Sequence, residues 1–312
     1  MHPLLNIAVQ AARRAGEVIA RAVPRLDSLE VTAKGRHDYV SDVDRAAERE
    51  IIAIIRKHYP QHAILAEESG ASGDNEVRWI IDPLDGTTNF LHGLPIFSVS
   101  IAAEVRGRLE VGVVYDPMRL ELFTATRGVG AQLEGKRIRV TKARTLEGTL
   151  IATGFPFRAN SDFETYLSML RVIMPQTAGI RRPGSAALDL AYVAAGRVDG
   201  FWEMGLQPWD TAAGALLIQE AGGHISRLDG SDYEHGGNVV AGGQKVHAAL
   251  VAAIAPFVPR AARTAGTLST QAASPLATPS STPTEPTEPA EPAEAGAALL
   301  GAAVLAPDGQ DG

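Results

Sequence analysis

The most informative part of this sequence is the stretch Trp79-Ile80-Ile81-Asp82-Pro83-Leu84-Asp85-Gly86-Thr87-Thr88-Asn89-Phe90. It begins with an apolar run that is typical of a buried strand, and it continues with two carboxylates three residues apart. A glycine and two threonines follow directly and supply backbone N–H groups and hydroxyls. Two hard anionic ligands beside free N–H groups suit a divalent cation and a phosphate together.

Asp82 and Asp85 also have a purely structural interpretation, because Asp-Pro and Asp-Gly are ordinary turn dipeptides. If the chain turns after the apolar run, however, both carboxylates and the Leu84 carbonyl converge on one side. Oxygen ligands of this kind suit Mg²⁺, which favours a few carboxylates with water and substrate phosphate. A helix beginning at Gly86-Thr87 would point its first N–H groups at a phosphate, although in isolation Gly-Thr-Thr is simply a turn.

Two more acidic positions are candidates for the same site. Glu67-Glu68 follows a short apolar run and is either a solvated pair or a metal ligand with its support. Asp210 precedes a helical pattern and is either the N-cap of that helix or a metal ligand. A carboxylate at that position can cap the helix with one oxygen and bind a metal with the other.

Several other residues are weaker candidates for substrate contacts. Ser185 and Ala186 begin a helical pattern, where a plain serine cap is the alternative interpretation. Arg181 could attract phosphate, although exposed arginine pairs such as Arg181-Arg182 are common. Glu203 follows an apolar strand ending and could accept hydrogen bonds from substrate hydroxyls. The eight histidines are scattered and form no metal-ligand pair.

The composition describes an ordinary soluble protein. The chain has 312 residues, enough for one large or two ordinary domains, and its 45% hydrophobic content can supply a sizeable core. It contains no cysteine, which excludes disulfides, zinc thiolate sites and thiol nucleophiles and is compatible with a reducing cytoplasm. No secretory leader and no membrane span are expected, because the apolar runs are too short or interrupted.

The acidic charge is concentrated in a C-terminal segment. The net charge is −7, but residues 264–312 hold six acidic residues and neither lysine nor arginine, so the remainder carries about −1. Neither part resembles a nucleic-acid binder by charge. The Pro-, Ala-, Thr- and Glu-rich composition predicts a catalytic unit at residues 1–262 and a disordered tail at residues 263–312, with a partner-binding extension as the alternative.

Hydrophobic spacing predicts a mixed fold. Helices are expected at residues 8–23, 41–58, 163–173, 185–195, 210–221 and 245–254, and Ser41 with Asp44 resembles a capping box. Strands are expected at residues 63–65, 77–81, 96–105, 109–115, 121–125, 138–140, 198–202, 224–226 and 238–240. Because strands and helices occur in segregated runs, the pattern favours a layered α+β fold over regular βαβ succession.

Three segments together resemble the inositol monophosphatase family in order and spacing. They are Ala66-Glu67-Glu68-Ser69, the stretch from Asp82 to Phe90, and Trp209-Asp210-Thr211-Ala212-Ala213-Gly214 with Glu220-Ala221-Gly222-Gly223. The resemblance extends from about residue 1 to residue 258. It is closest to bacterial SuhB-type members through Ala152-Thr153-Gly154-Phe155-Pro156-Phe157 and residues 184–200. It implies a layered αβαβα sandwich.

The resemblance also implies roles for individual residues. The implied Mg²⁺ ligands are Glu67, Asp82, the Leu84 carbonyl, Asp85 and Asp210. Glu67 and Thr87 would orient the attacking water, with Asp44 and Glu68 in support. The implied substrate contacts are Asp85, Gly86, Thr87, Arg181, Ser185, Ala186, Glu203 and Asp210. Pro183 stands where relatives are expected to have other residues.

The activity implied by the resemblance is hydrolysis of a phosphate monoester, with myo-inositol 1-phosphate as the expected substrate. Lithium inhibition, a homodimer and a cytoplasmic location are expected as family traits. Other family members act on nucleotide 3′-phosphates, fructose bisphosphate or histidinol phosphate. The alternative is a non-enzymatic role. The protein would then act in transcription antitermination and ribosomal RNA maturation through transcription-complex proteins. Direct binding of nucleic acid or membranes is not expected.

Overall fold

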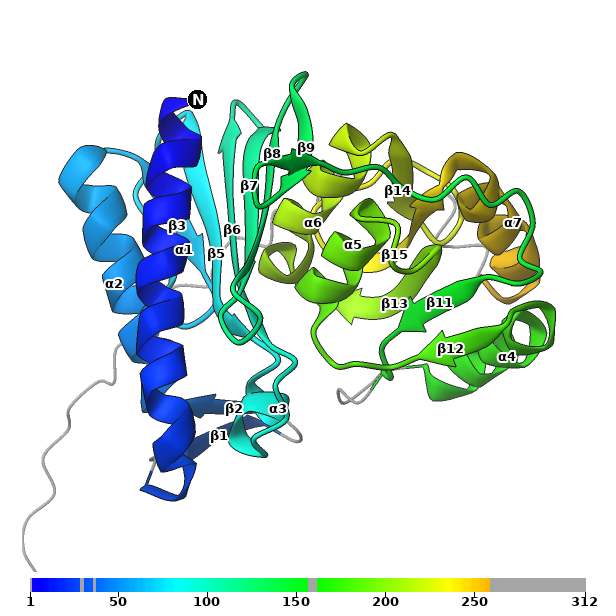
Figure 1. Ribbon diagram of the computed structural model, residues 1–312, viewed down its shortest axis with the longest axis horizontal. Helices are drawn as coiled ribbons and strands as arrows, with labels where there is room; N and C mark the ends of the chain where they lie inside the picture. Colours follow the sequence, from blue (N-terminus) through cyan, green and yellow to red (C-terminus); the bar gives the residue numbers. More distant parts are fainter. Residues whose placement is uncertain (1, 29–30, 36–37, 157–161, 259–312) are drawn as a thin grey trace, which may run out of the picture. The chain divides into compact units, whose positions relative to one another are not determined.

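Two large β-sheets form the frame of the protein, and helices cover and separate them (Figure 1). The structure is a computed structural model, and it describes residues 2–28, 31–35, 38–156 and 162–258. The tail expected at residues 263–312 lies outside the described residues.

The first sheet has eight strands in the order β10-β9-β8-β7-β6-β5-β3-β4. Only the β3–β5 pair is parallel, and the other neighbours run antiparallel. Its strands are β3 (Ala63–Ala66), β4 (Gly70–Ser72), β5 (Val77–Asp85), β6 (Ser98–Val105), β7 (Arg108–Asp116), β8 (Glu121–Thr126), β9 (Gly130–Leu133) and β10 (Lys136–Arg137). Strands β5, β6 and β7 lie at its centre and are almost entirely buried.

The second sheet has five strands in the order β12-β11-β13-β15-β14. Strand β11 pairs in parallel with both β12 and β13, whereas β15 pairs antiparallel with β13 and β14. Its strands are β11 (Leu150–Thr153), β12 (Gly179–Arg181), β13 (Gly200–Leu206), β14 (Gly223–Arg227) and β15 (Gly237–Gly243). A separate hairpin joins β1 (Val31–Gly35) to β2 (Asp38–Ser41).

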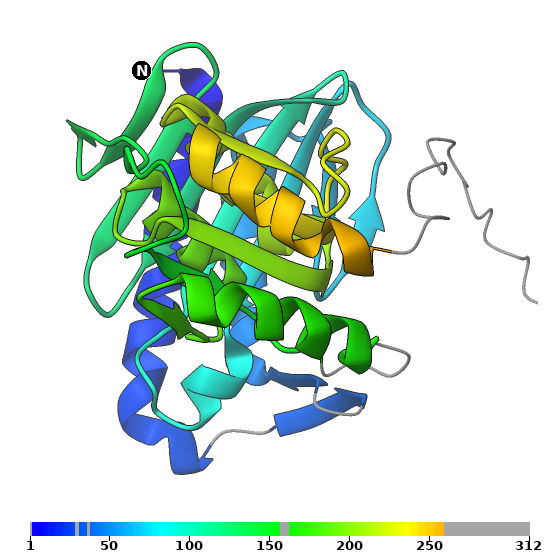
Figure 2. The same ribbon diagram turned by 90° about the vertical axis from the view of Figure 1, so that its right-hand side faces the viewer.

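The helices form three layers around these sheets. They are α1 (Pro3–Ala22), α2 (Asp42–His58), α3 (Thr87–Leu91), α4 (Phe163–Ile173), α5 (Ala186–Ala194), α6 (Pro208–Glu220) and α7 (Gln244–Ile254), with short 3₁₀ turns at Val23–Ser28, Met174–Gln176 and Ala255–Phe257. Helices α1 and α2 cover the outer face of the first sheet, and α5 with α6 lies between the sheets (Figure 1). Helices α4 and α7 cover the outer face of the second sheet (Figure 2). The expected αβαβα sandwich is therefore confirmed.

Three apolar cores fill the interfaces between the layers. One core joins α1 and α2 to the first sheet, the second surrounds α5 and α6, and the third lies under α4 and α7. Helix α6 is buried along most of its length, and it is apolar on every side because it packs against both sheets. Gly112 on β7 permits this approach, since a Cβ there would lie 2.9 Å from the Ala213 carbonyl oxygen.

Several expected elements are confirmed, and three need correction. The helix expected at residues 8–23 begins earlier and spans Pro3–Ala22. The Ser41–Asp44 capping box at the start of α2 is present, and α4 spans the expected residues 163–173. Helix α6 begins at Pro208, with Gln207 as N-cap, so the interpretation of Asp210 as N-cap is wrong. Residues 138–140 form no strand. Strand β10 ends at Arg137, and the Val140 N–H donates to the Ala221 carbonyl at the end of α6 at 3.3 Å.

Strand β5 matters most for the site because its regular pairing ends in an irregularity. Its register against β6 shifts between Asp82 and Asp85, where Pro83 has no N–H to donate. The expected strand at residues 77–81 therefore continues to Asp85 and brings both carboxylates to the end of the sheet. Among the described residues, no helix has the length and apolar character needed to cross a membrane.

Candidate active site

Three carboxylates converge where β5 ends and α6 begins. Oxygen atoms of Asp82, Asp85 and Asp210 all lie within 4.8 Å of one another. Asp82 and Asp85 come from the irregular end of β5, and Asp210 comes from the first turn of α6. Asp210 also accepts a hydrogen bond from the Gln207 backbone N–H at 2.7 Å, so its carboxylate orients the start of α6 while it faces the cluster.

Asp82 lies in an electrostatic environment that disfavours its charged form. Its side chain is 2% exposed, and its Oδ1 accepts a hydrogen bond from the Leu84 N–H at 3.0 Å. Burial raises the pKa of Asp82 well above its usual value, and the charges of Glu67, Asp85 and Asp210 raise it further. Buried like charges of this kind are costly unless a cation compensates them.

These residues fit a divalent metal ion. The cluster consists of hard oxygen ligands, Asp82 and Asp210 in it are buried, and the charges that act on Asp82 are those of other carboxylates. A site of this composition suits Mg²⁺ or a similar hard cation. The two carboxylates predicted from the spacing in the sequence therefore do come together, and Asp210 joins them from a point 125 residues beyond Asp85 in the chain.

Asp85 is held by the first turn of α5. Its Oδ2 accepts hydrogen bonds from the Ser185 hydroxyl at 2.5 Å and from the Ala187 N–H at 2.8 Å. Burial raises the pKa of Asp85 to about 6, although these hydrogen bonds act in the opposite direction. Ser185 is the N-cap residue of α5, but its side chain makes no capping bond, because the hydroxyl faces Asp85 instead.

Glu67 and Glu68 follow β3 in the chain and lie beside β5. The Glu67 N–H donates to the Ile81 carbonyl at 3.1 Å, which continues the pairing of β3 with β5 by one residue. The Glu68 N–H donates to the buried Glu48 carboxylate at 2.8 Å. Glu48 on α2 therefore fixes the turn from which Glu67 reaches the cavity.

Thr87 connects the end of β5 to α2. Its hydroxyl oxygen lies 2.9 Å from Asp44 Oδ1 and 3.1 Å from the Leu84 carbonyl oxygen, and the hydroxyl can donate to either. Gly86 precedes it with φ +96°, and a Cβ there would lie 2.9 Å from the Ile96 carbonyl oxygen, so the turn requires glycine. Burial raises the pKa of Asp44, whereas its hydrogen bonds from Ser41 and Thr87 lower it.

A cavity of about 490 Å³ opens over these groups. Ten of the residues predicted from the sequence line it, namely Glu67, Asp82, Leu84, Asp85, Gly86, Thr87, Ser185, Ala186, Glu203 and Asp210. Asp44 and Glu68 lie behind this wall. Asp44 accepts a hydrogen bond from Thr87 in the wall, and the Glu68 N–H donates to Glu48 on α2. The predicted residues are thus brought together on one cavity, with one exception.

The exception is Arg181, which does not line the cavity, so its substrate contact stays a prediction. Arg182, rather than Arg181, lines the cavity, and its guanidinium lies 5.4 Å from the centroid of the Phe155 ring. Arg181 is the last residue of β12 and donates to the Ile180 carbonyl at 3.0 Å. Successive side chains of an extended chain point to opposite sides, so two adjacent arginines do not share one wall.

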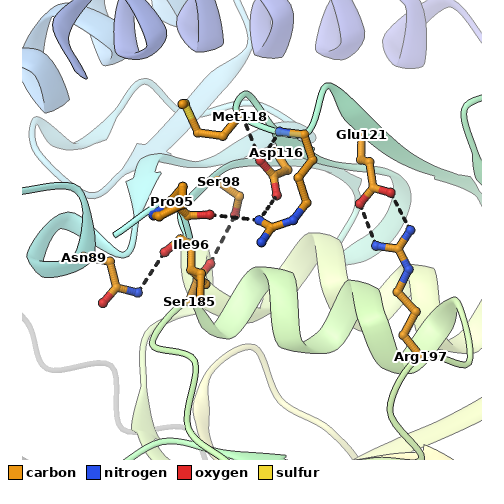
Figure 3. A network of polar contacts seen from close by, with 10 residues as sticks. Asn89, Pro95, Ile96, Ser98, Asp116, Met118, Glu121, Ser185 and Arg197 are labelled. Atoms are coloured by element: carbon orange, nitrogen blue, oxygen red, sulfur yellow. Dashed lines mark hydrogen bonds and ion pairs between the residues drawn. The ribbon is translucent and has the colours of Figure 1, made fainter. Parts of the chain in front are cut away.

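Sequence reasoning assigned no role in the site to Asn89 and Gly154, which line the cavity, or to Glu48, which supports its wall. Asn89 donates to the Ile96 carbonyl at 2.8 Å and the Pro183 carbonyl at 2.9 Å, and so joins α3 to the segment before α5. Figure 3 shows its bond to Ile96 beside the 3.4 Å contact between the Ser98 and Ser185 hydroxyls. A signal for Glu48 was available, because it lies one helical turn after Asp44 on the buried face of α2.

Comparisons with known proteins agree with this geometry. The chain is 58% identical to Nus factor SuhB of Escherichia coli K12 over 255 residues, covering 81% of this chain and 96% of that protein. The crystal structure of extragenic suppressor protein suhB from Bartonella henselae matches with a TM-score of 0.79 and 47% identity, covering 81% of this chain and 98% of that one. The structure of inositol monophosphatase from Anabaena matches with a TM-score of 0.72 and 39% identity, covering 83% and 98%.

The matching family model describes the inositol monophosphatase family and covers residues 1–260, which include every residue that lines the cavity. The family model thus matches most of the chain, and the relatives share both a high percentage of identical residues and the fold. The chain belongs to the inositol monophosphatase family.

Proposed function

We propose that the protein is a Mg²⁺-dependent phosphatase that hydrolyses phosphate monoesters, with myo-inositol 1-phosphate as substrate. The observation that carries this proposal is the arrangement of Asp82, Asp85 and Asp210 within 4.8 Å of one another in a cavity that the Thr87 side chain also lines. Such a cavity combines ligands for a hard cation with groups that can orient water beside a phosphate.

The metal ligands in this proposal are Glu67, Asp82, the Leu84 carbonyl, Asp85 and Asp210. Mg²⁺, when bound, would lower the pKa of a bound water and stabilise the charge that develops on the phosphate and the leaving alkoxide. The buried Asp82 carboxylate supports this assignment, because among the described residues its charge is surrounded by other acids.

Thr87 and Asp44 would orient the attacking water. When the Thr87 hydroxyl donates its single proton to Asp44, its lone pairs remain free to accept a hydrogen bond from water. Glu67 would accept the other hydrogen of the same water and act as general base. No covalent intermediate is part of this scheme, because the water itself attacks the phosphorus.

The remaining residues of the wall would hold the substrate. The N–H groups of Gly86 and Thr87 lie at the start of α3 and would bind phosphate oxygens. Arg182 would add positive charge at the cavity wall, and Ser185 with Ala186 would border the ring. Glu203 lies on the wall contributed by the second sheet, where it would accept hydrogen bonds from ring hydroxyls.

A phosphate-release assay on a panel of sugar, nucleotide and aryl monophosphates would test this proposal. Release from myo-inositol 1-phosphate should depend on added Mg²⁺, cease with chelator and be inhibited by lithium. Asp82→Asn is the negative control for contaminating phosphatases. A preference for a nucleotide 3′-phosphate would replace the proposed substrate with another of the same reaction class, whereas no release from any ester would remove the catalytic proposal.

A second candidate function is participation in transcription antitermination through protein partners. The observation that favours it is the name of the relatives, since the Escherichia coli and Pseudomonas aeruginosa proteins are called Nus factors and are 58% and 56% identical to this chain. The role could coexist with catalysis. Restoration of antitermination by the Asp82→Asn variant in cells lacking the native protein would show that the role is independent of phosphate hydrolysis, and failure of the unsubstituted chain would remove it.

A further inference from the structure

The Glu203 carboxyl group occupies the place of a missing side chain on the neighbouring strand. Thr153 at the end of β11 pairs in register with Trp202 on β13, so Gly154 and Glu203 follow side by side. A Cβ added at Gly154 would lie 2.0 Å from Glu203 Oε1, 2.1 Å from Cδ and 2.4 Å from Oε2. Both residues line the cavity.

The backbone conformation does not explain a glycine at position 154. Gly86 and Gly184, which line the same cavity, have φ values of +96° and +99°, in the region that favours glycine. Gly154 lies outside that region. The conformation is therefore open to other residues, and the demand for glycine comes from the space that the Glu203 carboxyl group fills.

The chain on both sides of Gly154 is anchored, whereas the Glu203 carboxyl group is the end of a flexible side chain. The Thr153 hydroxyl lies 3.2 Å from the Tyr166 hydroxyl, and the Phe155 ring packs edge-on against the Tyr166 ring with 5.7 Å between centroids. A methyl group at position 154 would thus displace the carboxyl group and leave the backbone in place.

We propose that Gly154 is a positioning residue that determines specificity for polyhydroxylated phosphate esters. By lacking a side chain, it lets the Glu203 carboxylate lie across the end of β11 and face the ring hydroxyls of a substrate. The inference rests on the proposed function, because Gly154 would place the Glu203 carboxylate that accepts hydrogen bonds from those hydroxyls.

The test compares Gly154→Ala with the unsubstituted full-length protein on two substrates, myo-inositol 1-phosphate and para-nitrophenyl phosphate. For the inositol ester, kcat/KM should fall about tenfold to a hundredfold, mainly through KM, because a hydrogen bond to a charged group is lost. For the aryl ester, which has no ring hydroxyls to be held, kcat/KM should stay near that of the unsubstituted protein. The melting temperature should not fall, since no backbone strain is introduced.

Two controls separate positioning from a general structural effect. In a Glu203→Ala background, Gly154→Ala should cause no further loss, because no carboxyl group remains to be displaced. Gly179→Ala is the matched control in the same sheet, since its Cβ would meet the end of the Arg181 side chain at 3.1 Å and Leu150 Cδ1 at 3.6 Å, and neither residue lines the cavity. Equal losses on both esters, an additive double variant or a lower melting temperature would overturn the inference.

The failure of this inference is distinguishable from the failure of the proposed function. Absence of phosphate release by the unsubstituted protein would contradict the proposed function. An active protein whose Gly154→Ala variant keeps its preference for the inositol ester would contradict the inference alone. A crystal structure of the variant with the Glu203 carboxyl group still lying over residue 154 would overturn the inference whatever the activity.

Discussion

The Thr87 hydroxyl oxygen lies 2.9 Å from the Asp44 carboxylate and joins the first turn of α3 to the first turn of α2. Asp44 also accepts hydrogen bonds from the Ser41 N–H and hydroxyl in the capping box of α2. One buried carboxylate therefore closes the start of a helix and fixes the orientation of a hydroxyl in the cavity wall. The two functions of Asp44 are coupled, since any shift of the α2 terminus moves the carboxylate that accepts the hydrogen bond from the Thr87 hydroxyl.

We expect Asp44→Ala and Thr87→Ala each to lower kcat about a hundredfold, with a small effect on KM, because each would leave the attacking water unoriented. The double variant should be no slower than the slower single variant, because both changes remove the same contact. Steady-state kinetics on inositol phosphate would measure this. Asp42→Ala, on the exposed side of the same helical turn, is the matched control. Additive losses in the double variant would contradict a shared role.

Asp82→Asn should lower kcat by about a thousandfold or more, because it removes an anionic ligand from a site proposed to bind metal. The same change should raise the melting temperature in chelator, since it relieves repulsion from Glu67, Asp85 and Asp210. This gain should grow as pH rises, because the folded pKa of Asp82 lies above its unfolded value and ionisation of the folded protein is therefore costly. Near-normal turnover at saturating Mg²⁺ would refute the assignment.

Arg182→Ala should raise KM for the phosphate ester about tenfold, because it removes a cation from the cavity wall. Arg181→Ala provides a matched comparison. It removes the same charge from the preceding residue, which does not line the cavity. Parallel measurement of KM at constant ionic strength would separate a local contact from a change in net charge. A larger effect at Arg181 would restore the original assignment from the sequence.

His247 should make the protein less stable in mild acid. Burial, with a smaller effect of neighbouring His224, lowers the pKa of His247 from 6.5 to about 4. Between these values the unfolded chain binds a proton that the folded protein does not, so stability falls as pH decreases from about 6.5 toward 4. Acid weakens the folded state because protonation would place a charge on a buried ring beside His224.

Urea unfolding of His247→Gln at about pH 4.5 and about pH 7.5 would measure this contribution. The variant should lose less stability than the unsubstituted protein between the two conditions, even if it is less stable at the higher pH. His58→Gln, at the exposed end of α2, is the control. Equal pH dependence in the His247 variant and the unsubstituted protein would contradict the prediction.

Local sequence patterns determined the elements that depend on near neighbours in the chain. Helices α2, α4 and α7 were predictable because apolar spacing and end signals act within a few residues. The central strands of the first sheet were predictable for the same reason. The hairpin β1–β2 and the short strands β4 and β12 were not, because pairing with a partner stabilises them more than their own composition does.

The sequence by itself also determined which residue types the site contains. The spacing of Asp82 and Asp85 before Gly86 indicated metal and phosphate chemistry, and the three family motifs identified Glu67 and Asp210 as their partners. Asp82 and Asp85 do lie together in the structure, because a strand end followed by a tight turn places its side chains locally, whatever the rest of the fold.

Only the tertiary structure decided how these residues meet. It showed that Asp44 accepts from Thr87, that Arg182 rather than Arg181 reaches the cavity, and that Glu203 lies across Gly154. Each of these contacts joins segments that are brought together by the packing of the helical layers on the two sheets, in which α6 is buried between both. Such packing is a collective result of three apolar cores, so a short stretch of sequence carries too little information to specify it.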